Sequence, residues 1–374
     1  MFGLIIAFAL ITRLWNLQIP SVYYFDEVYN AFTTQEFVKG NKDAYELFHT
    51  STVPGTAYGW THPPLAKLIA SLGILSFGDN AFGWRVGSAI IGTLCIALIY
   101  LISRELMPKT YALLACLFSS MDGLILVQSR INMNDIFALF FILLCFYAFV
   151  AHRKNILFLS ISLGLLLATK WTGLYALVIF GWRKHIVPML LMIVGIYLLS
   201  YSQYFTLGGT LTNFIELQKQ MWWYNTNLTA THTYQSSWWT WPFMIRTVWY
   251  YVDYQKQTIA NIYALGNPIL WWLGIPALLY ALFKRQWLIV IGFLTFWLPW
   301  ALAPRIMFLY HYLPSVPFLC MALAYALSQF KNKILTFTIT SFIILGFIYF
   351  FPIWTGVPIP KEFVNQYFWL PSWR

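Results

Sequence analysis

Residues 82–103 read FGWRVGSAIIGTLCIALIYLIS, an apolar run whose single charge, Arg85, stands close to its start. At about 1.5 Å per residue, a helix of this length covers the roughly 30 Å hydrocarbon core of a bilayer. Similar apolar runs recur along the 374-residue chain and are separated by short polar segments. The pattern predicts a membrane protein with many crossings.

The composition agrees with this class of protein. Hydrophobic residues make up 60% of the chain and charged residues only 9%, against about 25% in an average soluble domain. The net charge of +11 is scattered in ones and twos, without a basic stripe, so we expect no nucleic-acid partner. All four cysteines lie inside apolar runs, where they predict neither a disulfide nor a metal site.

We expect about eleven transmembrane helices in one membrane-embedded domain spanning residues 1–374, with no internal repeat. The first apolar run lacks a cleavage-site pattern and is interpreted as a retained helix. The expected crossings are residues 2–17, 82–103, 110–127, 134–151, 155–169, 172–182, 186–205, 268–283, 286–302, 312–328 and 334–351.

Charge placement predicts how these helices are oriented. With alternate crossings, five short basic connections fall on one side of the membrane; they are 104–109, 152–154, 183–185, 284–285 and 331–333. The positive-inside rule makes that side cytoplasmic, so we expect a cytoplasmic N-terminus and an external C-terminus. Two long external loops, 18–81 and 206–267, then face outward. EVYNAFTTQEFVKG and PPLAKLIASLGILSF in the first loop have the periodicity of amphipathic helices along the outer surface.

The outer ends of the helices collect polar residues, including an adjacent acid pair in SVYYFDEVYN. Ionisable groups at membrane depth are costly and usually face a cavity where they pair or bind substrate. The alternative is that a single arginine such as Arg13 or Arg130 extends to the lipid headgroups, and that the many Trp and Tyr residues form an interfacial belt. The gathered residues are Arg13, Asp26, Glu27, His62, Arg85, Arg130, Asn132, Asn134, Asp135, Lys170, Arg305 and His311.

Cations converging with a carboxylate pair suit transfer of a sugar from an anionic lipid phosphate. The phosphate leaves while a carboxylate deprotonates the incoming hydroxyl. One carboxylate base without a carboxylate nucleophile gives single displacement and inversion at the sugar carbon. The chain has no phosphate-binding Gly-rich loop, no HExxH and no GxSxG, which leaves nucleotide, zinc-protease and serine-hydrolase functions without support.

The order of several motifs resembles the protein O-mannosyltransferase family. The blocks are FDEVYNAF, THPPLAKL, GWRVGSAIIGT, SMDGLILVQSRINMNDIFALFF, ATKWTGLYAL, HTYQSSWWTWPFMIRTVWYY, IYALGNPILWW and LPWALAPRIMFLYHYLPSVPF. The resemblance implies an all-α GT-C membrane fold with eleven crossings. It also implies inverting transfer of mannose from a polyprenyl or dolichyl phosphate to Ser or Thr of proteins, on the non-cytoplasmic face. The loop 206–267 is too short for the β-trefoil insert of eukaryotic members, so the chain resembles a compact prokaryotic member.

The resemblance also assigns roles to residues. It makes Asp26 the base, with Glu27 supporting substrate or structure, and it gives Arg85 and Lys170 to the donor phosphate. Further candidates for phosphate binding are Arg13 and Arg305.

Five more residues are candidates for substrate binding. His62 stands in a His-Pro-Pro block that fixes a turn, so a structural role is the alternative. We expect Asp135 to pair with Arg130 and orient the bend between them. His311 lies in a helix mouth near Arg305 in sequence, and His232 is expected to touch the acceptor.

No cofactor is firmly implied, and the spacing demands no metal, although the acid pair with His62 leaves a divalent cation open. The expected partners are a lipid-linked sugar donor, membrane lipids and a Ser/Thr-containing protein emerging at the secretion channel. The expected location is a prokaryotic cell membrane, with the active site outside. Two alternatives stay open: a related GT-C transferase with a lipid or glycan acceptor, and a transporter or flippase of lipid-linked sugar. The transporter would need deep ionisable groups and an internal repeat.

Overall fold

The computed structural model describes residues 1–153, 155–180 and 186–374. The chain divides into two compact units, and each is described by itself. The first unit contains residues 1–13, 93–128 and 231–374, and the second contains residues 14–92 and 129–230. The expected connection 183–185, residue 154 of the connection 152–154 and the end of the expected helix 172–182 lie outside the described residues.

Helices dominate the chain. The α-helices are α1 (Phe2–Leu14), α2 (Glu27–Val38), α3 (Leu65–Phe77), α4 (Ala81–Arg104), α5 (Lys109–Ser120), α6 (Gly123–Gln128), α7 (Asn134–Ala151), α8 (Ile156–Leu167), α9 (Gly173–Phe180), α10 (Ile186–Ser200), α11 (Ser202–Thr206), α12 (Leu211–Asn227), α13 (Pro268–Phe283), α14 (Trp287–Trp297), α15 (Val316–Phe330) and α16 (Lys333–Thr355). The 3₁₀ helices are η1 (Lys42–Tyr45), η2 (Trp238–Phe243), η3 (Leu298–Leu302), η4 (Leu309–Ser315), η5 (Lys361–Tyr367) and η6 (Pro371–Trp373). The strands are β1 (Val248–Tyr254), β2 (Thr258–Ala264) and β3 (Ile359–Pro360).

Among the residues that the structure describes, four helical stretches are long and apolar enough to cross a membrane: Ala81–Arg104, Asn134–Ala151, Leu309–Phe330 and Lys333–Thr355. Shorter apolar helices at α1, α8, α10, α13 and α14 fall on other expected crossings. The predicted helical, multi-pass architecture is therefore confirmed. Two helices are present in the segment 18–81, as expected: α2 and α3. The expected amphipathic character is not seen in α3, which is an apolar helix that buries Lys67 and exposes Leu72 and Leu75.

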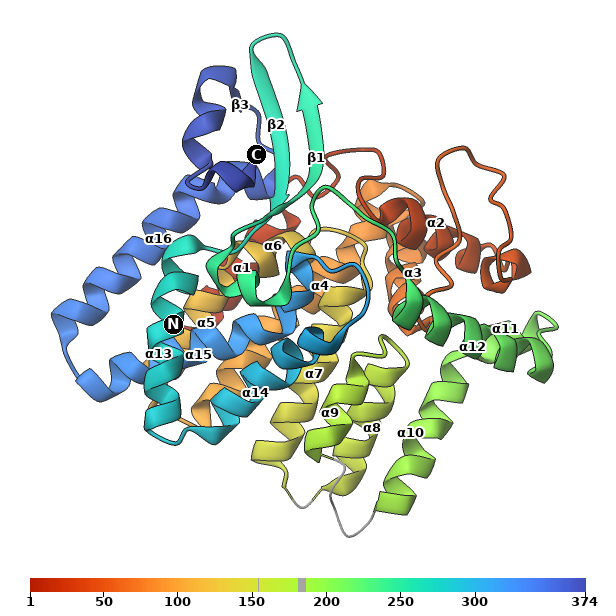
Figure 1. Cartoon of the computed structure of the whole chain (residues 1–374), viewed down its shortest axis with the longest axis horizontal. Helices are drawn as coiled ribbons and strands as arrows, with labels where there is room; N and C mark the ends of the chain where they lie inside the picture. Colours follow the sequence, from red (N-terminus) through yellow and green to blue (C-terminus); the bar gives the residue numbers. More distant parts are fainter. Residues whose placement is uncertain (154, 181–185) are drawn as a thin grey trace. The chain divides into compact units, whose positions relative to one another are not determined.

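In the first unit, α13 and α15 pack together, and α15 also packs on α5 and α14. A small antiparallel sheet of order β1-β2-β3 accompanies these helices, and β2 packs against α16. Val248 pairs with Ala264 and Tyr254 with Ile259, so β1 and β2 form a hairpin that extends beyond the helices of the unit (Figure 1). The all-α fold expected from the sequence does not include this sheet. Its strands, VWYYVDY and TIANIYA, are rich in the aromatic and β-branched residues that favour extended chain.

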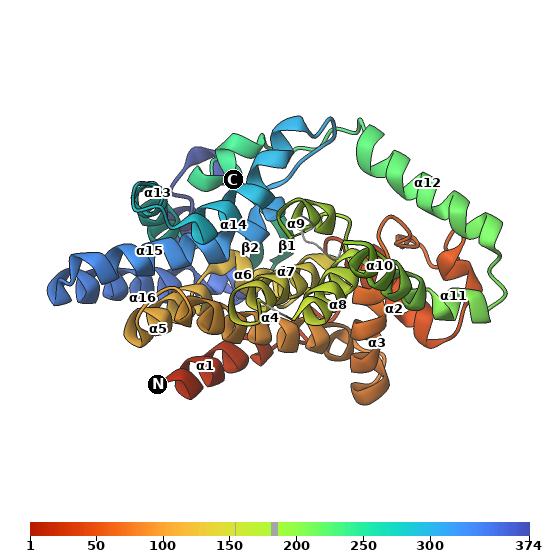
Figure 2. The ribbon, with the colours of Figure 1, turned by 90° about the horizontal axis from the view of Figure 1, so that it is seen from below.

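In the second unit, α8 packs between α7 and α10, and α9 packs on α7 and α8 (Figure 2). Beside them, α2 packs against α3, and α3 in turn contacts α7. Pro64 precedes the first residue of α3, where the missing proline N–H costs nothing because a helix start leaves that donor without an intrahelical partner. The first long loop therefore folds as two short helices packed on the bundle.

Polar side chains set several helix boundaries. The expected helix 110–127 is two helices, because Asp122 Oδ1 accepts from Ile125 N at 2.9 Å and caps α6. Asn155, Asn267 and Asn332 cap α8, α13 and α16 through side-chain oxygens that accept from backbone N–H groups. Periodicity alone does not reveal such a break, since the apolar pattern continues across it.

Candidate active site

Asp26 directly precedes α2 in the second unit. The preceding residue, Phe25, has φ of 51°, a left-handed conformation uncommon for a residue with a side chain, and this turn leads into the helix. Asp26 is partly exposed, and its side chain does not cap α2. Across the residues that the structure describes, its carboxylate has no hydrogen-bond or ion-pair partner. The side chain is thus available to a substrate.

Glu27, the neighbouring acid, is in the opposite situation. It is fully buried, and both of its oxygens are bound to Arg85: Oε1 accepts from Nε at 2.8 Å and Oε2 from Nη2 at 2.7 Å. The backbone N–H groups of Tyr24 and Asn132 also donate to this carboxylate. Such a bidentate, fully hydrogen-bonded pair is the arrangement that makes a buried ion pair tolerable.

Arg85 is also fully buried, and its remaining donors go to backbone carbonyls. Nη1 donates to the carbonyls of Leu17 and Pro20, and Nη2 donates to that of Val22. Together with the two bonds to Glu27, these contacts use all five N–H groups of a guanidinium. The expected donor-phosphate role of Arg85 is therefore corrected: the side chain ties residues 17–27 to α4 and positions Asp26.

The segment 129–134 docks against α2 and completes this part of the site. Arg130 Nη1 donates to the Trp15 carbonyl at 2.7 Å, and the Arg130 carbonyl accepts from the Tyr24 hydroxyl. Asn132 Nδ2 donates to Thr34 and Asn134 Nδ2 to Asn30, each at 3.3 Å. The segment 129–134 thus contacts α2 through side-chain amides, and Arg130 is buried within it.

Asp135, at the start of α7, pairs with Lys170, with Oδ1 and Nζ 2.7 Å apart. The expected pairing of Asp135 with Arg130 is therefore wrong. Arg130 is closer in sequence, but the turn between α8 and α9 brings Lys170 to the carboxylate. Both members of the pair are nearly buried and act electrostatically on Asp26.

The electrostatics of Asp26 suit a proton acceptor. Although the residue is partly exposed, the surrounding protein removes much of the water from its carboxyl group. This desolvation, and then the negative charge of Asp135, raise the pKa of Asp26 to about 7, while Lys170 opposes the shift. A pKa near neutrality gives a carboxylate that is ionised in part at pH 7 and is a stronger base than an ordinary aspartate. The structure therefore brings Asp26, Asp135 and Lys170 into one electrostatic group.

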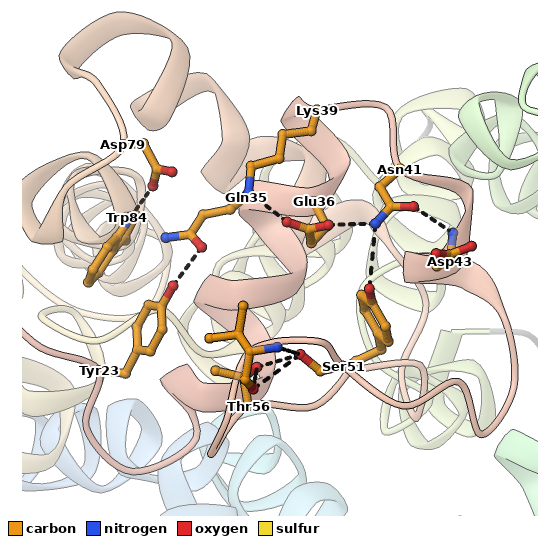
Figure 3. A network of polar contacts seen from close by, with 12 residues as sticks. Tyr23, Gln35, Glu36, Lys39, Asn41, Asp43, Ser51, Thr56, Asp79 and Trp84 are labelled. Atoms are coloured by element: carbon orange, nitrogen blue, oxygen red, sulfur yellow. Dashed lines mark hydrogen bonds and ion pairs between the residues drawn. The ribbon is translucent and has the colours of Figure 1, made fainter.

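The far end of α2 is held by a separate polar network (Figure 3). Glu36 binds Lys39 at 2.7 Å and Asn41 at 2.6 Å, and the Tyr23 hydroxyl donates to Gln35. The contacts of Glu36 fix the end of α2 against the residues that follow it, and the Tyr23 contact ties it to the chain that precedes the helix. Both ends of the helix are therefore anchored, which keeps the position of Asp26 defined.

His62 lies in the turn before α3 and lines a small pocket together with Trp60 and Lys67. The turn is fixed by Leu65 N, which donates to the Ala168 carbonyl at 3.1 Å, two residues before Lys170. A cation held by the acid pair with His62 does not fit this geometry, because Arg85 occupies both oxygens of Glu27.

Within the described ranges, Asp43, Glu46 and His49 are the one cluster whose ligand atoms lie close enough together to hold a metal ion. They are surface groups that pair among themselves. Nothing else at this cluster points to a cation.

Four expected site residues belong to the first unit. Arg13 is fully buried in α1, where Nη1 donates to the Ala9 carbonyl at 3.1 Å. His311 stacks on Trp300 with ring centroids 4.2 Å apart, and its Nδ1 accepts from Phe308 N. His232 packs edge-on against Phe308, so the two histidines share one aromatic cluster. The fourth residue, Arg305, is partly buried between η3 and η4.

Two buried residues of the second unit were not singled out from the sequence. Tyr24 bridges the ion pair and the 129–134 segment, because its ring lies 4.8 Å from the Arg85 guanidinium carbon and its hydroxyl binds the Arg130 carbonyl. Lys67 is a buried lysine within an otherwise apolar helix. Its presence in THPPLAKL was the available signal, since a charge in an apolar stretch is costly without a function.

Solved structures with the same fold define the class of protein. The fold is similar to the Saccharomyces cerevisiae protein O-mannosyltransferase Pmt1-Pmt2 complex bound to the sugar donor, with a TM-score of 0.81, 17% identity and coverage of 100% of this chain and 92% of that chain. It is also similar to ArnT from Cupriavidus metallidurans in the apo state, with a TM-score of 0.66, 15% identity and coverage of 91% and 61%. The chain therefore has the GT-C fold of multi-pass membrane glycosyltransferases.

The family follows from the sequence matches. The model described as dolichyl-phosphate-mannose-protein mannosyltransferase matches residues 3–204, and that of the C-terminal four TMM region of protein-O-mannosyltransferase matches 210–287 and 281–373. The polyprenol-phosphate-mannose–protein mannosyltransferase of Mycolicibacterium smegmatis is 27% identical, with coverage of 100% of this chain and 92% of the relative. The chain belongs to the protein O-mannosyltransferase family. The resemblance noted from the sequence, and the enzyme class it implied, are confirmed.

Proposed function

We propose that this enzyme moves mannose from a polyprenyl phosphate mannose to Ser or Thr hydroxyls of proteins, with Asp26 as the base. The acceptor hydroxyl binds at the Asp26 carboxylate, which takes its proton as the oxygen attacks the anomeric carbon. The bond from that carbon to the phosphate oxygen breaks, and the lipid phosphate leaves with the electron pair. Glu27 is held by Arg85 and cannot act as a nucleophile, so the reaction is a single displacement with inversion.

The contrast between the two neighbouring acids carries this proposal. Asp26 is partly exposed and has a pKa raised to about 7. Glu27 is fully buried and bound by four donors. A base must reach its substrate and lose its proton near working pH. Asp26 meets both conditions, whereas Glu27 holds the scaffold together with Arg85.

Lys170 is the cation placed to receive the donor phosphate. Its ammonium has three N–H donors, and the bond to Asp135 uses one. The remaining donors can bind phosphate oxygens as negative charge develops on the leaving group. Arg85 has no donor left for this task. Arg13, Arg305, His232 and His311 belong to the first unit, and their roles in phosphate or acceptor binding stay predictions.

We place the active site on the external face of a prokaryotic cell membrane, with a cytoplasmic N-terminus and an external C-terminus. The support is the positive-inside rule, which puts the short basic connections inside and the loop containing Asp26 outside. An acceptor on that side is a protein that leaves the cell, and it meets the enzyme while still extended at the secretion channel. Membrane lipids surround the apolar helices.

A transfer assay tests the function. The purified protein is given polyprenyl phosphate mannose and a Ser/Thr-rich peptide, and the mannosyl-peptide is measured by mass spectrometry. Wild type and the matched control Glu46→Gln, which changes an exposed acid of the same loop, are expected to form product. Asp26→Asn is expected to lower the rate by at least about a hundredfold, the lower range of general-base contributions.

The outcomes separate the alternatives. If folded wild type forms no mannosyl-peptide but glycosylates a lipid or glycan in the same assay, the acceptor is that lipid or glycan and not a protein. If Asp26→Asn keeps its activity, Asp26 is not the base, although the protein is still a transferase. Retention of the anomeric configuration in the product would contradict single displacement.

A further inference from the structure

A side-chain amide in the first turn of α2 links Asp26 to the start of α7. Asn30 is buried, and its Nδ2 donates to the Asp26 carbonyl oxygen at 3.2 Å. Its Oδ1 accepts from Asn134 Nδ2 at 3.3 Å. Asn134 is the first residue of α7 and directly precedes Asp135, the acid that acts electrostatically on Asp26. One amide therefore bonds the backbone of the proposed base on one side and the start of α7 on the other.

Helix formation does not require this amide. The Asp26 carbonyl already accepts from the Asn30 backbone N–H at 2.9 Å, so Nδ2 is a second donor to the same oxygen. Asparagine is also a poor residue inside a helix, because its side chain competes with the backbone for hydrogen bonds. A buried amide is costly unless it is hydrogen-bonded, and Asn134 supplies the bond to its oxygen. The contribution of Asn30 is therefore the contact between α2 and α7.

Other bonds between α2 and the segment that precedes α7 hold different groups. Asn132 N donates to the Glu27 carboxylate at 3.1 Å, and Asn132 Nδ2 donates to Thr34 Oγ1 at 3.3 Å. These bonds fix the buried ion pair of Glu27 and the second turn of α2. By contrast, the bond from α7 to Asn30 ends at the residue that holds the Asp26 carbonyl. Asn30 is thus the member of this network that bears on where Asp26 stands relative to α7.

Asp26 has charged neighbours on several elements. Desolvation of its carboxyl group, then the negative charge of Asp135, raise the pKa of Asp26, and the positive charge of Lys170 opposes the rise. Because Asp135 has the larger effect of the two, the pKa of Asp26 depends on how close it stands to this ion pair. Other titratable groups that lie around the start of α2 are Tyr23, Tyr24, Glu27, Tyr29, Lys67, Arg85 and Arg130. A fixed separation between α2 and α7 therefore keeps the base at one strength.

We propose that Asn30 is a positioning residue for the transfer reaction, because its amide sets where the Asp26 carboxylate stands relative to the Asp135–Lys170 pair. This inference rests on the proposed role of Asp26 as the base. Asn30 does not touch the substrate and acts through Asp26. The base then stands at a fixed separation from Lys170, the cation proposed to receive the donor phosphate, so the acceptor hydroxyl and the donor meet in a reactive geometry.

The variant Asn30→Leu keeps about the same side-chain size and removes both amide bonds. The kcat at high pH is expected to fall by about tenfold or more, since a misplacement of about 1 Å can cost up to a hundredfold. The acid limb of the kcat profile is expected to move below pH 7, because Asp26 gains water and moves away from Asp135. The KM for polyprenyl phosphate mannose is expected to stay within about twofold, because Lys170 keeps its bond to Asp135.

A double variant separates positioning from stability. Asn30→Leu alone leaves the Asn134 amide buried without its partner, whereas Asn30→Leu with Asn134→Leu removes both polar groups and should recover thermal stability. The low kcat and the shifted acid limb are expected to persist in this stable double variant. Asn134→Ser, which breaks the same bond from α7 and leaves α2 unchanged, is expected to shift the limb in the same direction, so the inference stays testable if either leucine variant folds poorly.

The matched control is Asn225→Leu on α12. Asn225 also donates to the carbonyl four residues before it, that of Met221, at 2.9 Å, and to a carbonyl of another segment, that of Thr61, at 3.2 Å. Its variant is expected to keep the wild-type acid limb, because the lost bonds do not involve Asp26.

A second pair of variants tests the route of the effect. If Asn30 acts by holding Asp26 near Asp135, the two residues are coupled, and the effects of their variants do not add. In an Asp135→Asn background, Asn30→Leu is therefore expected to shift the acid limb by less than it does in wild type. Equal shifts in the two backgrounds would mean that Asn30 does not act through Asp135.

Two further results would overturn this inference and leave the proposed base in place. The first is a folded Asn30→Leu enzyme with the wild-type kcat and acid limb. The second is a double variant whose kcat recovers together with its thermal stability, which would make the role of Asn30 structural. If Asp26→Asn keeps its activity, the proposed base fails, and this inference fails with it.

Discussion

Arg85 and Glu27 form a bidentate ion pair in the buried interior of the second unit, with N–O distances of 2.8 and 2.7 Å. The pair fastens α4 to the first turn of α2, and Arg85 also binds three carbonyls of the chain that leads to Asp26. Asp26 is therefore held in place through the ion pair of its neighbour Glu27. One acid of the motif reacts in the proposed chemistry, and the other determines where it stands.

The first prediction concerns this pair. Arg85→Met leaves the Glu27 carboxylate buried without its partner, which costs about 3–5 kcal/mol. The midpoint of thermal unfolding in detergent should therefore fall steeply. The matched control Arg104→Met, at the exposed end of the same helix, is expected to change the midpoint little. Adding Glu27→Gln to Arg85→Met should recover part of the lost thermal stability, because the buried negative charge is gone. If the double variant is no more stable than Arg85→Met, the loss does not come from the unpaired Glu27 carboxylate.

The second prediction is the pH dependence of transfer. A base must be deprotonated, and the pKa of Asp26 is raised to about 7. The rate at saturating substrate should therefore rise with pH by up to about tenfold per unit below pH 7 and level off above it. The measurement is a pH profile of kcat between pH 5 and 9. A profile that is flat from pH 5 upward would mean that Asp26 titrates with an ordinary carboxyl pKa, or is not the base.

The third prediction is the effect of Asp26 on stability. Because its pKa is higher in the folded than in the unfolded chain, the folded state binds the proton more tightly. Its stabilising contribution is complete below the unfolded pKa, near 3.8, and is lost as pH rises through about 7. Asp26→Asn cannot ionise, so it should gain thermal stability relative to wild type between pH 5 and 8. If the gain in unfolding midpoint of Asp26→Asn over wild type shrinks or reverses as pH rises, the pKa of Asp26 is not raised on folding.

The fourth prediction concerns the first unit. Asp122 accepts from Ile125 N at 2.9 Å, which caps α6, and from Trp271 Nε1 at 2.6 Å. Asp122→Ala removes the cap and leaves a buried indole N–H unsatisfied, for a loss of about 2–4 kcal/mol. Asp122→Asn keeps an acceptor oxygen and should lose less. Thermal unfolding of both variants checks the order, and equal losses would mean that the charge, not the hydrogen bonds, matters.

Much of the architecture could be predicted because apolar runs report the helices directly. The run 82–103 became α4 almost unchanged, and the periodicity of 134–151 became α7. The acid pair also stood out, since carboxylates are rare in this chain. Helix boundaries that a single side chain determines were harder to predict, because Asp122 divides an apolar run that looks continuous in the sequence.

Pairings within the site were harder to predict because they depend on long-range packing. Asp135 was expected to bind the sequence neighbour Arg130, but the packing of α7 with α8 and α9 presents Lys170 instead. Arg85 was expected to face the substrate, yet the carbonyls that surround it come from a loop whose path the sequence does not reveal. Lys67 was overlooked because a single lysine in a helix usually lies at its surface.

The last prediction uses the opposing charges around Asp26. Asp135 raises the pKa of Asp26 and Lys170 lowers it. Asp135→Asn should therefore move the acid limb of the kcat profile below pH 7, and Lys170→Met should move it above pH 7. Lys170→Met should also raise the KM for polyprenyl phosphate mannose by about tenfold or more, because a charge-assisted hydrogen bond to phosphate is lost. The measurement is the pH profile of each variant together with the donor titration. Shifts of the two limbs in the same direction would contradict the electrostatic account, since the two side chains bear opposite charges.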